Sequence, residues 1–379
     1  MNEFDLVGAQ FLRRKGLSAA PMGVRGRNIA PAGNARTVDL SGFLVAPGII
    51  DLHGDAFERH LAPRRGVVKD LVPALISTDA ELAANGITTA ILAQFWSWEG
   101  GMRSPAFAKG LLEALSGEIG MITDCRVQLR FETHMLQHYA EFECVVDRFG
   151  IKYVVFNDHL PHKALTCGKR PPRLTMQALK GGRSPETHLN LMRSLHAQSA
   201  EVRPSIAELV KRFRSKNVHM GSHDDTSGEV RQWWRSIGVG ISEFPKSFGA
   251  AKNAREGGDT IVLGAPNIVR GGSHSSNVSA RDLVMRGLCD VLASDYHYPA
   301  LRQAALKLVA EGDVSLSASW GLISERPAEI LGLSDRGVLE CGRRADLVII
   351  CPKTGQIGAT MVAGRFSFLA GEVADRFIK

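Results

Sequence analysis

The sequence predicts an α/β fold: a (β/α)8 TIM-type barrel with a small β-sandwich domain built from both termini. Between residues 48 and 297, eight short apolar or β-branched runs alternate with longer helical-looking segments, a pattern typical of parallel strands joined by helices. Most of these runs end in acidic or imidazole side chains. Short strands punctuated by glycine flank the runs on both sides and favour an additional β domain.

Length and composition agree with this prediction. The chain has 379 residues, which suits one large barrel with an appendage. Hydrophobic residues make up 44% and charged residues 22%, an ordinary globular composition. The formal net charge is +7, but Lys and Arg are spread along the chain without a nucleic-acid-binding motif. We therefore expect no nucleic-acid partner, whereas a polyanionic small molecule would suit the surplus charge if part of it converges on one cleft.

The N-terminal stretch and the cysteines indicate the compartment. The first residues place acids before a short apolar run and bases after it, the reverse of a secretory signal. No run approaches the roughly 20 apolar residues of a membrane span. The 6 cysteines are scattered without a C-x-x-C pair, so neither a disulfide framework nor a thiolate zinc site is indicated. We expect a cytoplasmic protein without a membrane partner, and homo-oligomer formation is left open.

The barrel elements are predicted in order along the chain. Helices are expected at 77–85, where Ser77 or Thr78 can cap, at 184–202 and at 279–288. The predicted strands cover residues 48–55, 87–93, 125–132, 152–159, 218–225, 239–245, 260–267 and 290–297.

Both ends of the chain are assigned to the β domain. We predict that residues 1–47 and 336–379 pair into one composite β domain, and that residues 48–335 form the hydrolase barrel.

The strand ends predict a metal site. His53 and Asp55 are two residues apart at the end of the first run, so alternation places them on the same face. In a barrel of this class the carboxyl ends of the strands meet at one rim, where active sites are assembled. Imidazole and carboxylate together suit Zn²⁺, Mn²⁺ or Fe²⁺. The acids and histidines at the later strand ends are Glu132, Asp158, His159, His223, Asp224, Asp225, Glu243 and Asp295.

A single His-x-Asp is common by chance, but its recurrence at several strand ends favours a metal site. Asp224 and Asp225 can instead be solvated helix-capping acids, and Asp158 faces the opposite way from His159. We expect one or two Zn²⁺ ions, with Mn²⁺ and Fe²⁺ as alternatives. The predicted ligands are His53, Asp55, Glu132, His159, His223 and Asp295. No role is assigned to His134, His138, His162, His188, His196 and His219.

These motifs resemble a known family. "PGIIDLHGD", "RGVLECGRRADLVII" and the final "LASD" are similar to the amidohydrolase superfamily. Within it, "LHGDAFERHLAPRRGV", "GITTAILA", "SHDD", "GAPNIVRGGSHSSN" and "SDYHYPA" resemble the PhnM family of phosphonate-pathway triphosphate diphosphatases. The likeness covers nearly all of the chain beyond residue 45.

The resemblance implies an activity. The family hydrolyses α-D-ribose 1-methylphosphonate 5-triphosphate to the 5-phosphate and pyrophosphate, ahead of the carbon–phosphorus lyase step. By the same resemblance, Asp295 is the catalytic residue that takes a proton from the attacking hydroxide. The superfamily often has His-x-His and a carboxylated lysine, whereas this chain has His53-x-Asp55 and Glu132 as its bridging candidate.

Two further segments are candidates for substrate contact. The Gly-rich stretch 267–276 offers guanidinium, hydroxyl and backbone N–H groups fit for phosphate oxygens, although such a stretch is often an ordinary loop. The aromatic residues Phe95, Trp96 and Trp98 either stack on the substrate or pack the barrel wall. The predicted substrate-binding residues are Asn267, Arg270, Ser273 and His274 of the Gly-rich stretch, together with Arg64 in "APRRGV" and Lys169 in "GKRPPR", two basic loops that would add positive charge.

Two alternatives remain. A cyclic-amide or N-acyl amidohydrolase, dihydroorotase-like or deacetylase-like, would use the same metals, and a metal-storing barrel would need no phosphate-binding loop. Metal-dependent pyrophosphate release from a triphosphate distinguishes all three.

Overall fold

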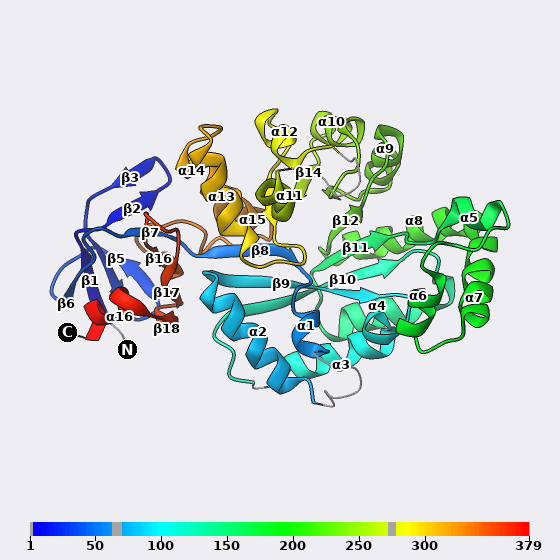
Figure 1. Cartoon of the computed structure of the whole chain (residues 1–379), viewed down its shortest axis with the longest axis horizontal. Helices are drawn as coiled ribbons and strands as arrows, with labels where there is room; N and C mark the ends of the chain where they lie inside the picture. Colours follow the sequence, from blue (N-terminus) through cyan, green and yellow to red (C-terminus); the bar gives the residue numbers. More distant parts are fainter. Residues whose placement is uncertain (1–2, 63–69, 118, 272–277, 379) are drawn as a thin grey trace. The chain divides into compact units, whose positions relative to one another are not determined.

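The computed structural model describes residues 3–62, 70–117, 119–271 and 278–378. An eight-stranded sheet with the order β15-β14-β13-β12-β11-β10-β9-β8 forms the barrel (Figure 1). A bridge between Gly54 and Asp295 joins the first barrel strand to the last. The predicted fold is confirmed, and every predicted strand is present: β8 (Ile49–Gly54), β9 (Ile87–Trp96), β10 (Asp124–Glu132), β11 (Tyr153–Asn157), β12 (His219–His223), β13 (Ile241–Glu243), β14 (Thr260–Gly264) and β15 (Val291–Ala293).

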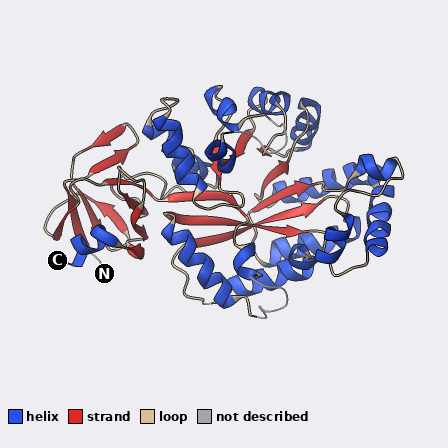
Figure 2. Ribbon diagram, in the orientation of Figure 1, coloured by secondary structure: helices blue, strands red, loops and turns tan. Residues whose placement is uncertain are grey.

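Burial explains why the sequences of the barrel strands are almost entirely apolar. Strands of a parallel sheet are covered on both faces, and all residues of β9 are buried. Helices separate the strands along the chain (Figure 2). They are α1 (Glu58–Leu61), α2 (Val72–Ala84), η1 (Gly101–Arg103), α3 (Pro105–Leu115), η2 (Leu136–His138), α4 (Tyr139–Arg148), α5 (His162–Thr166), α6 (Leu174–Lys180), α7 (Pro185–Ala197), α8 (Ser199–Ser215), α9 (Gly228–Ile237), α10 (Phe248–Glu256), α11 (Ala265–Arg270), α12 (Ala280–Met285), α13 (Ala300–Ala310), α14 (Leu316–Gly321), α15 (Glu325–Ile330) and α16 (Gly371–Ile378).

The predicted start of α2 is wrong. The helix begins at Val72, whose N–H donates to the Asp70 carboxylate, and a proline lies in its first turn. The hydroxyls of Ser77 and Thr78 donate to carbonyls four residues earlier, so they lie inside the helix instead of capping it.

The terminal strands come from both ends of the chain. One sheet has the order β5-β4-β1-β6, and the other has the order β18-β17-β16-β7-β2-β3. In the second sheet β7 pairs antiparallel with β16, which joins the two chain ends (Figure 1). The boundaries at residues 47 and 336 stay a prediction. The strands are β1 (Glu3–Val7), β2 (Gln10–Arg13), β3 (Gly16–Ser18), β4 (Met22–Arg25), β5 (Asn28–Ala30), β6 (Arg36–Asp39), β7 (Leu44–Pro47), β16 (Leu347–Ile350), β17 (Ile357–Val362) and β18 (Arg365–Leu369).

The chain divides into two compact units. Unit 1 comprises residues 1–92, 119–126 and 262–379, and unit 2 comprises residues 93–118 and 127–261. Within unit 2, aromatic rings from β10, α4 and α8 form a continuous core, in which Phe142 stacks on Phe131 and meets Phe213 edge-on. Among the described residues, no helix is both long and apolar enough to cross a membrane.

Candidate metal centre

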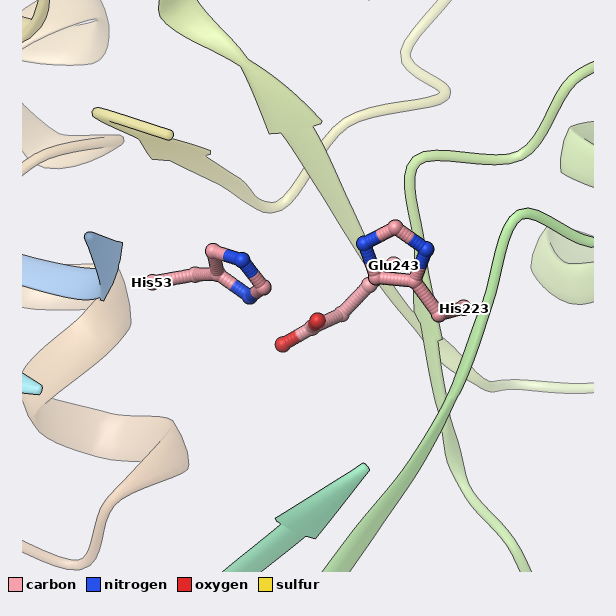
Figure 3. Close-up of side chains that lie close together, drawn as sticks. All are labelled: His53, His223 and Glu243. Atoms are coloured by element: carbon pink, nitrogen blue, oxygen red, sulfur yellow. The ribbon is translucent and has the colours of Figure 1, made fainter. Parts of the chain in front are cut away.

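Unit 1 brings together three of the predicted ligands. One donor atom each from His53, Asp55 and Asp295 lies within 4.8 Å of the others. His53 is fully buried near the end of β8 (Figure 3), and Asp295 follows β15. The alternation argument for His53 and Asp55 therefore leads to a real convergence of donor atoms. We call this set the unit 1 donor group.

Main-chain hydrogen bonds hold the unit 1 donor group. The Asp295 N–H donates to the His53 carbonyl at 2.9 Å, and the Asp55 N–H donates to the Asp295 carbonyl at 2.9 Å. Asp295 has a φ of 54°, a left-handed conformation that Asp and Asn adopt more readily than most residues. The main chain at Asp295 is thus fixed to that of His53 and Asp55.

Asp51 ties the first barrel strand to the last beneath this group. Its carboxylate accepts hydrogen bonds from the Ser294 N–H at 3.0 Å and from the Ser294 hydroxyl. Burial raises the pKa of Asp51, although these hydrogen bonds act in the opposite direction. A Cβ on Gly54 would lie 2.5 Å from Asp51 Oδ2 and 2.9 Å from Tyr298 Cε1, so the "HGD" motif needs glycine at this position.

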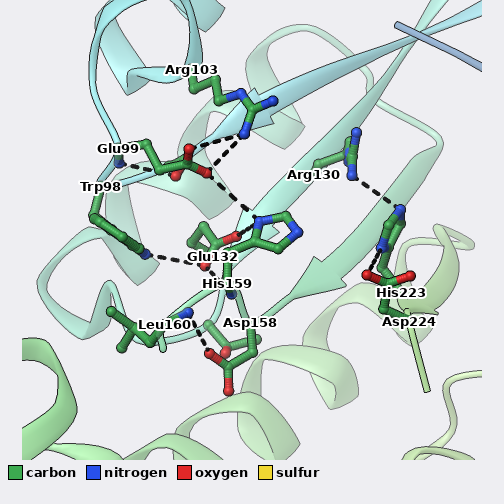
Figure 4. Close-up of polar contacts among 12 residues, drawn as sticks. Trp98, Glu99, Arg103, Arg130, Glu132, Asp158, His159, Leu160, His223 and Asp224 are labelled. Atoms are coloured by element: carbon green, nitrogen blue, oxygen red, sulfur yellow. Dashed lines mark hydrogen bonds and ion pairs between the residues drawn. The ribbon is translucent and has the colours of Figure 1, made fainter. Parts of the chain in front are cut away.

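Unit 2 places two further predicted ligands, Glu132 and His223, each beside His159. Donor atoms of Glu99, Glu132 and His159 lie within 4.8 Å of one another, and so do those of His159, His223 and Asp224. We call Glu132, His159 and His223 the unit 2 donor group. Glu132 ends β10 and is fully buried, and its Oε1 lies 2.6 Å from His159 Nδ1 (Figure 4). Burial opposes charge on both partners, but their mutual attraction and hydrogen bonding lower the pKa of Glu132 and raise that of His159. Each partner therefore favours the charged form of the other.

Side chains from β9 and the following loop hold the Glu132–His159 pair. Trp98 Nε1 donates to Glu132 Oε2 at 3.2 Å, and Glu99 Oε1 lies 3.7 Å from His159 Nδ1. Arg103 in turn binds both Glu99 oxygens at 2.9 and 3.0 Å. Phe95, Trp96 and Trp98 are each at most 3% exposed, so the aromatic segment packs the interior, and Trp98 also positions the carboxylate.

His223 has its own fixed surroundings (Figure 4). Arg130 Nη2 lies 3.0 Å from His223 Nε2. The Asp224 carboxylate lies 3.5 Å from His223 Nδ1 and 2.9 Å from Lys246 Nζ. Burial opposes the charge on Asp224, but His223 and Lys246 outweigh it and hold its pKa well below its ordinary value.

The solvated-cap interpretation of Asp224 and Asp225 is wrong. The N-cap of α9 is Ser227, whose side chain accepts from the Val230 N–H. Asp225 is buried and accepts hydrogen bonds from the hydroxyls of Ser222 and Ser242. Its role is to join β12 to β13.

Glu243 at the end of β13 lies beside His223 at the end of β12, its partner in strand register (Figure 3). Glu243 is fully buried and accepts hydrogen bonds from Gln128 Nε2 at 2.7 Å and from the Tyr153 hydroxyl. Glu243 thus adds a buried carboxylate beside His223, although it is not among the predicted ligands.

Three strand ends carry a non-glycine residue with a left-handed backbone, and among the described residues Arg173, Asn217 and Ala363 have the same conformation elsewhere. Asp224, Phe244 and Asp295 follow β12, β13 and β15, and each has a positive φ, of 64°, 53° and 54°. Non-glycine residues adopt this conformation at a cost of about 1–3 kcal/mol and cluster at functional sites.

The predicted phosphate-binding residues are described only in part. Arg64, Ser273 and His274 lie outside the described residues. Arg270 donates to Asn267 Oδ1 at 3.0 Å, and Lys169 is exposed. The predicted loop is wrong for its first part, because residues 265–270 form α11. Gly271 is the left-handed C-cap of that helix, with a φ of 79°.

Sequence reasoning missed several neighbours of the predicted ligands. Arg130 is two residues before Glu132 on the same strand, so alternation could have placed both on one face. Glu99 follows the second strand in the same way that the predicted ligands follow theirs. The contact of Trp98 with Glu132 could not be predicted, because the sequence does not distinguish a tryptophan that donates to a carboxylate from one that only packs in the core.

Solved structures share this fold at low sequence identity. N-acetylglucosamine-6-phosphate deacetylase from Pasteurella multocida is 12% identical, with a TM-score of 0.64 over 96% of this chain and 99% of that one. An amidohydrolase is 13% identical, with a TM-score of 0.64 over 98% and 100% of the two chains. Molinate hydrolase is 12% identical, with a TM-score of 0.61 over 96% and 94%. The chain thus has the fold of the amidohydrolase superfamily.

A closer relationship comes from sequence. No family model matches the chain. The α-D-ribose 1-methylphosphonate 5-triphosphate diphosphatase of Escherichia coli K12 is 32% identical over 332 residues, which cover 84% of this chain and 86% of that protein. The chain belongs to the family of this diphosphatase and is a hydrolase.

Proposed function

We propose that this protein is a metal-dependent hydrolase that releases pyrophosphate from α-D-ribose 1-alkylphosphonate 5-triphosphate in phosphonate degradation, ahead of the carbon–phosphorus lyase step. The 32% identity to the diphosphatase over 84% of the chain carries the proposal. The fold alone would not select this reaction, because its neighbours include a deacetylase.

The metal ligands proposed are His53, Asp55, Glu132, His159, His223 and Asp295. The donor sets fit divalent metal, because each group combines imidazole nitrogen with carboxylate oxygen. Residues around them also provide orienting contacts, such as the Trp98 hydrogen bond to Glu132. Zn²⁺ is the ion that we expect, with Mn²⁺ and Fe²⁺ as alternatives for the same donors.

A bound divalent metal supplies charge and a water whose pKa can fall from about 15.7 to about 7. Asp295, fixed by its main-chain hydrogen bonds, accepts a proton from the water that attacks the triphosphate. Arg270, next to Asn267 at the end of α11, contributes positive charge toward phosphate oxygens. Pyrophosphate leaves as a stable anion, so this reaction has less need of a general acid than amide hydrolysis has.

The deciding assay gives the purified, metal-loaded protein α-D-ribose 1-methylphosphonate 5-triphosphate, and separately a panel of cyclic amides and N-acyl amino acids. We expect pyrophosphate and the 5-phosphate product from the first substrate only. Ring opening or deacylation without pyrophosphate release would replace this proposal with the amidohydrolase alternative. A chelator-treated sample is the control, and its activity should return when metal is added.

A further inference from the structure

Unit 2 contains a cluster of histidines outside the ligands discussed so far. His134 follows β10, Asp158 follows β11, His162 begins α5 and His196 lies in the last turn of α7. The ring centroids of His134 and His162 are 4.8 Å apart, and those of His162 and His196 are 4.9 Å apart. These residues come from four separate segments, so no local sequence pattern groups them.

Three donor atoms of this cluster converge on one point. His162 Nε2 lies 3.0 and 2.9 Å from the two carboxylate oxygens of Asp158, and His134 Nδ1 lies 3.5 Å from Asp158 Oδ1. One donor atom from each of the three residues lies within 4.8 Å of the others. Ligands about 2.0–2.1 Å from a tetrahedral Zn²⁺ are about 3.3 Å apart, so the observed separations need little adjustment.

Hydrogen bonds on the outer side set the protonation of His134. The Ser199 hydroxyl donates its proton to the His196 carbonyl at 2.6 Å. It must therefore accept from His134 Nε2–H, which lies 3.2 Å away. The Nδ1 atom of His134 then lies 3.4 Å from the Thr133 hydroxyl and 3.5 Å from Asp158 Oδ1, and it is the nitrogen that would coordinate a metal.

His196 sets which nitrogen of His162 faces Asp158. Its Nδ1 lies 2.8 Å from His162 Nδ1, and its Nε2 lies 3.3 Å from Thr166 Oγ1. When His196 Nε2–H donates to Thr166, His196 Nδ1 accepts from His162 Nδ1–H. His162 Nε2 then faces Asp158, to which it donates in the metal-free chain, and a bound metal would replace that proton. A histidine whose outer nitrogen is held in this way is typical of metal ligands.

We propose that His134, Asp158 and His162 form a second metal site that binds Zn²⁺, separate from the strand-end ligands, with His196 and Ser199 as positioning residues. Two imidazole nitrogens and one carboxylate oxygen leave one tetrahedral position for water. The His134 side chain is 5% exposed, whereas Asp158 is 42% and His162 is 35% exposed, so an ion can reach the site. The site links the segments after β10 and β11 to α5.

Zinc counting tests the proposal. The metal-stripped full-length protein is dialysed against Zn²⁺, and bound zinc per chain is measured by mass spectrometry for wild type, His162→Ala and Asp158→Asn. Each variant should bind one zinc fewer than wild type. His138→Ala is the matched control, because His138 pairs with Glu141 at 2.9 Å outside the cluster and should leave the zinc count unchanged.

Each other outcome overturns the proposal. An unchanged zinc count in both variants would mean that the cluster is only an ion pair with its hydrogen bonds. Loss of more than one zinc from a folded variant would mean that these residues serve the strand-end metals. Circular dichroism confirms folding, and Asp158→Asn keeps the side-chain shape if His162→Ala does not fold. The difference between variant and wild type is informative whether or not the diphosphatase activity is found.

His196→Ala tests the positioning role. At saturating Zn²⁺ it should bind as many ions as wild type, but calorimetry should show the affinity of this site reduced about 10- to 100-fold, as for other residues that orient a ligand. An unchanged affinity would show that His196 does not position His162.

Discussion

The two donor groups are built from similar side chains but are held in different ways. In unit 1, main-chain hydrogen bonds between His53, Asp55 and Asp295 fix the ligands. In unit 2, side chains such as Trp98 and Arg130 hold Glu132 and His223. The fold around the unit 1 group should therefore tolerate a change of the Asp295 side chain but not a change of the backbone at Gly54. Metal binding by the unit 2 group should respond to changes in the side chains around it.

The largest expected effect is on catalysis by Asp295. Asp295→Asn should lower pyrophosphate release at least about 100-fold, since positioned acid–base groups contribute about 10²–10⁴-fold. Its melting temperature should stay close to that of wild type, because asparagine accepts the left-handed backbone and the main-chain bonds remain. Asp375→Asn, at an exposed position of α16, is the control. Unfolding of the Asp295 variant would contradict the backbone-held interpretation.

The second prediction changes the backbone of the same group. Gly54→Ala would place a Cβ 2.5 Å from Asp51 Oδ2 and 2.9 Å from Ser294 Oγ. We expect a loss of about 1–3 kcal/mol in the free energy of unfolding, measured by urea denaturation, together with loss of activity. Gly321→Ala has no atom within 4 Å of the added Cβ and should be neutral. Equal stability of the two variants would show that the strand junction is not tight.

The third prediction separates stability from catalysis along β10, which begins at Asp124 and ends at Glu132. Burial opposes charge on Asp124, but Arg126 and Arg336 outweigh it and lower its pKa from 3.8 to about 2. A carboxyl with a lowered pKa stabilises the fold above its unfolded pKa and loses that contribution as pH falls through the folded pKa. Wild type should therefore lose about 2 kcal/mol between pH 4 and pH 2.

Urea midpoints at pH 5, 3 and 2 check this third prediction. Asp124→Asn should be less stable at pH 5 and should lose less on acidification than wild type, while its zinc content should be unchanged. If wild type and Asp124→Asn lose the same free energy of unfolding on acidification, other carboxyl groups account for the loss of stability at low pH.

The smallest effect is expected for the neighbours of Glu132. Trp98→Phe keeps a buried ring but removes the hydrogen bond to Glu132 Oε2, and should weaken zinc binding to the unit 2 donor group about tenfold. Calorimetry with Zn²⁺ measures this. Trp96→Phe is the matched control: Trp96 is buried against Phe142, so its change should affect stability but not zinc affinity. Equal zinc affinity of both variants would remove Trp98 from the metal centre.

Much of the fold followed from sequence pattern. The apolar runs predicted all eight barrel strands, because strands buried on both faces need nearly continuous apolar residues. Alternation also predicted that the His53 and Asp55 side chains lie close together, and their donor atoms are within 4.8 Å of each other. The start of α2 was mispredicted because Ser77 and Thr78 resemble caps, whereas Pro73 and the Asp70 carboxylate define the start.

The rest depends on tertiary contacts that no local pattern records. His134, His162 and His196 occupy unremarkable positions in three segments, and only the packing of α5 and α7 brings their rings together. In the same way, the hydrogen bond from Trp98 to Glu132 spans 34 residues.

The link between Asp51 and Ser294 has a kinetic consequence. These residues are 243 positions apart in sequence, so the first and last barrel strands meet only after a very long loop has closed. Contacts of such high sequence separation slow folding. During synthesis, His53 and Asp55 leave the ribosome long before Asp295 does. A nascent chain therefore cannot complete the unit 1 donor group until its last barrel strand has emerged.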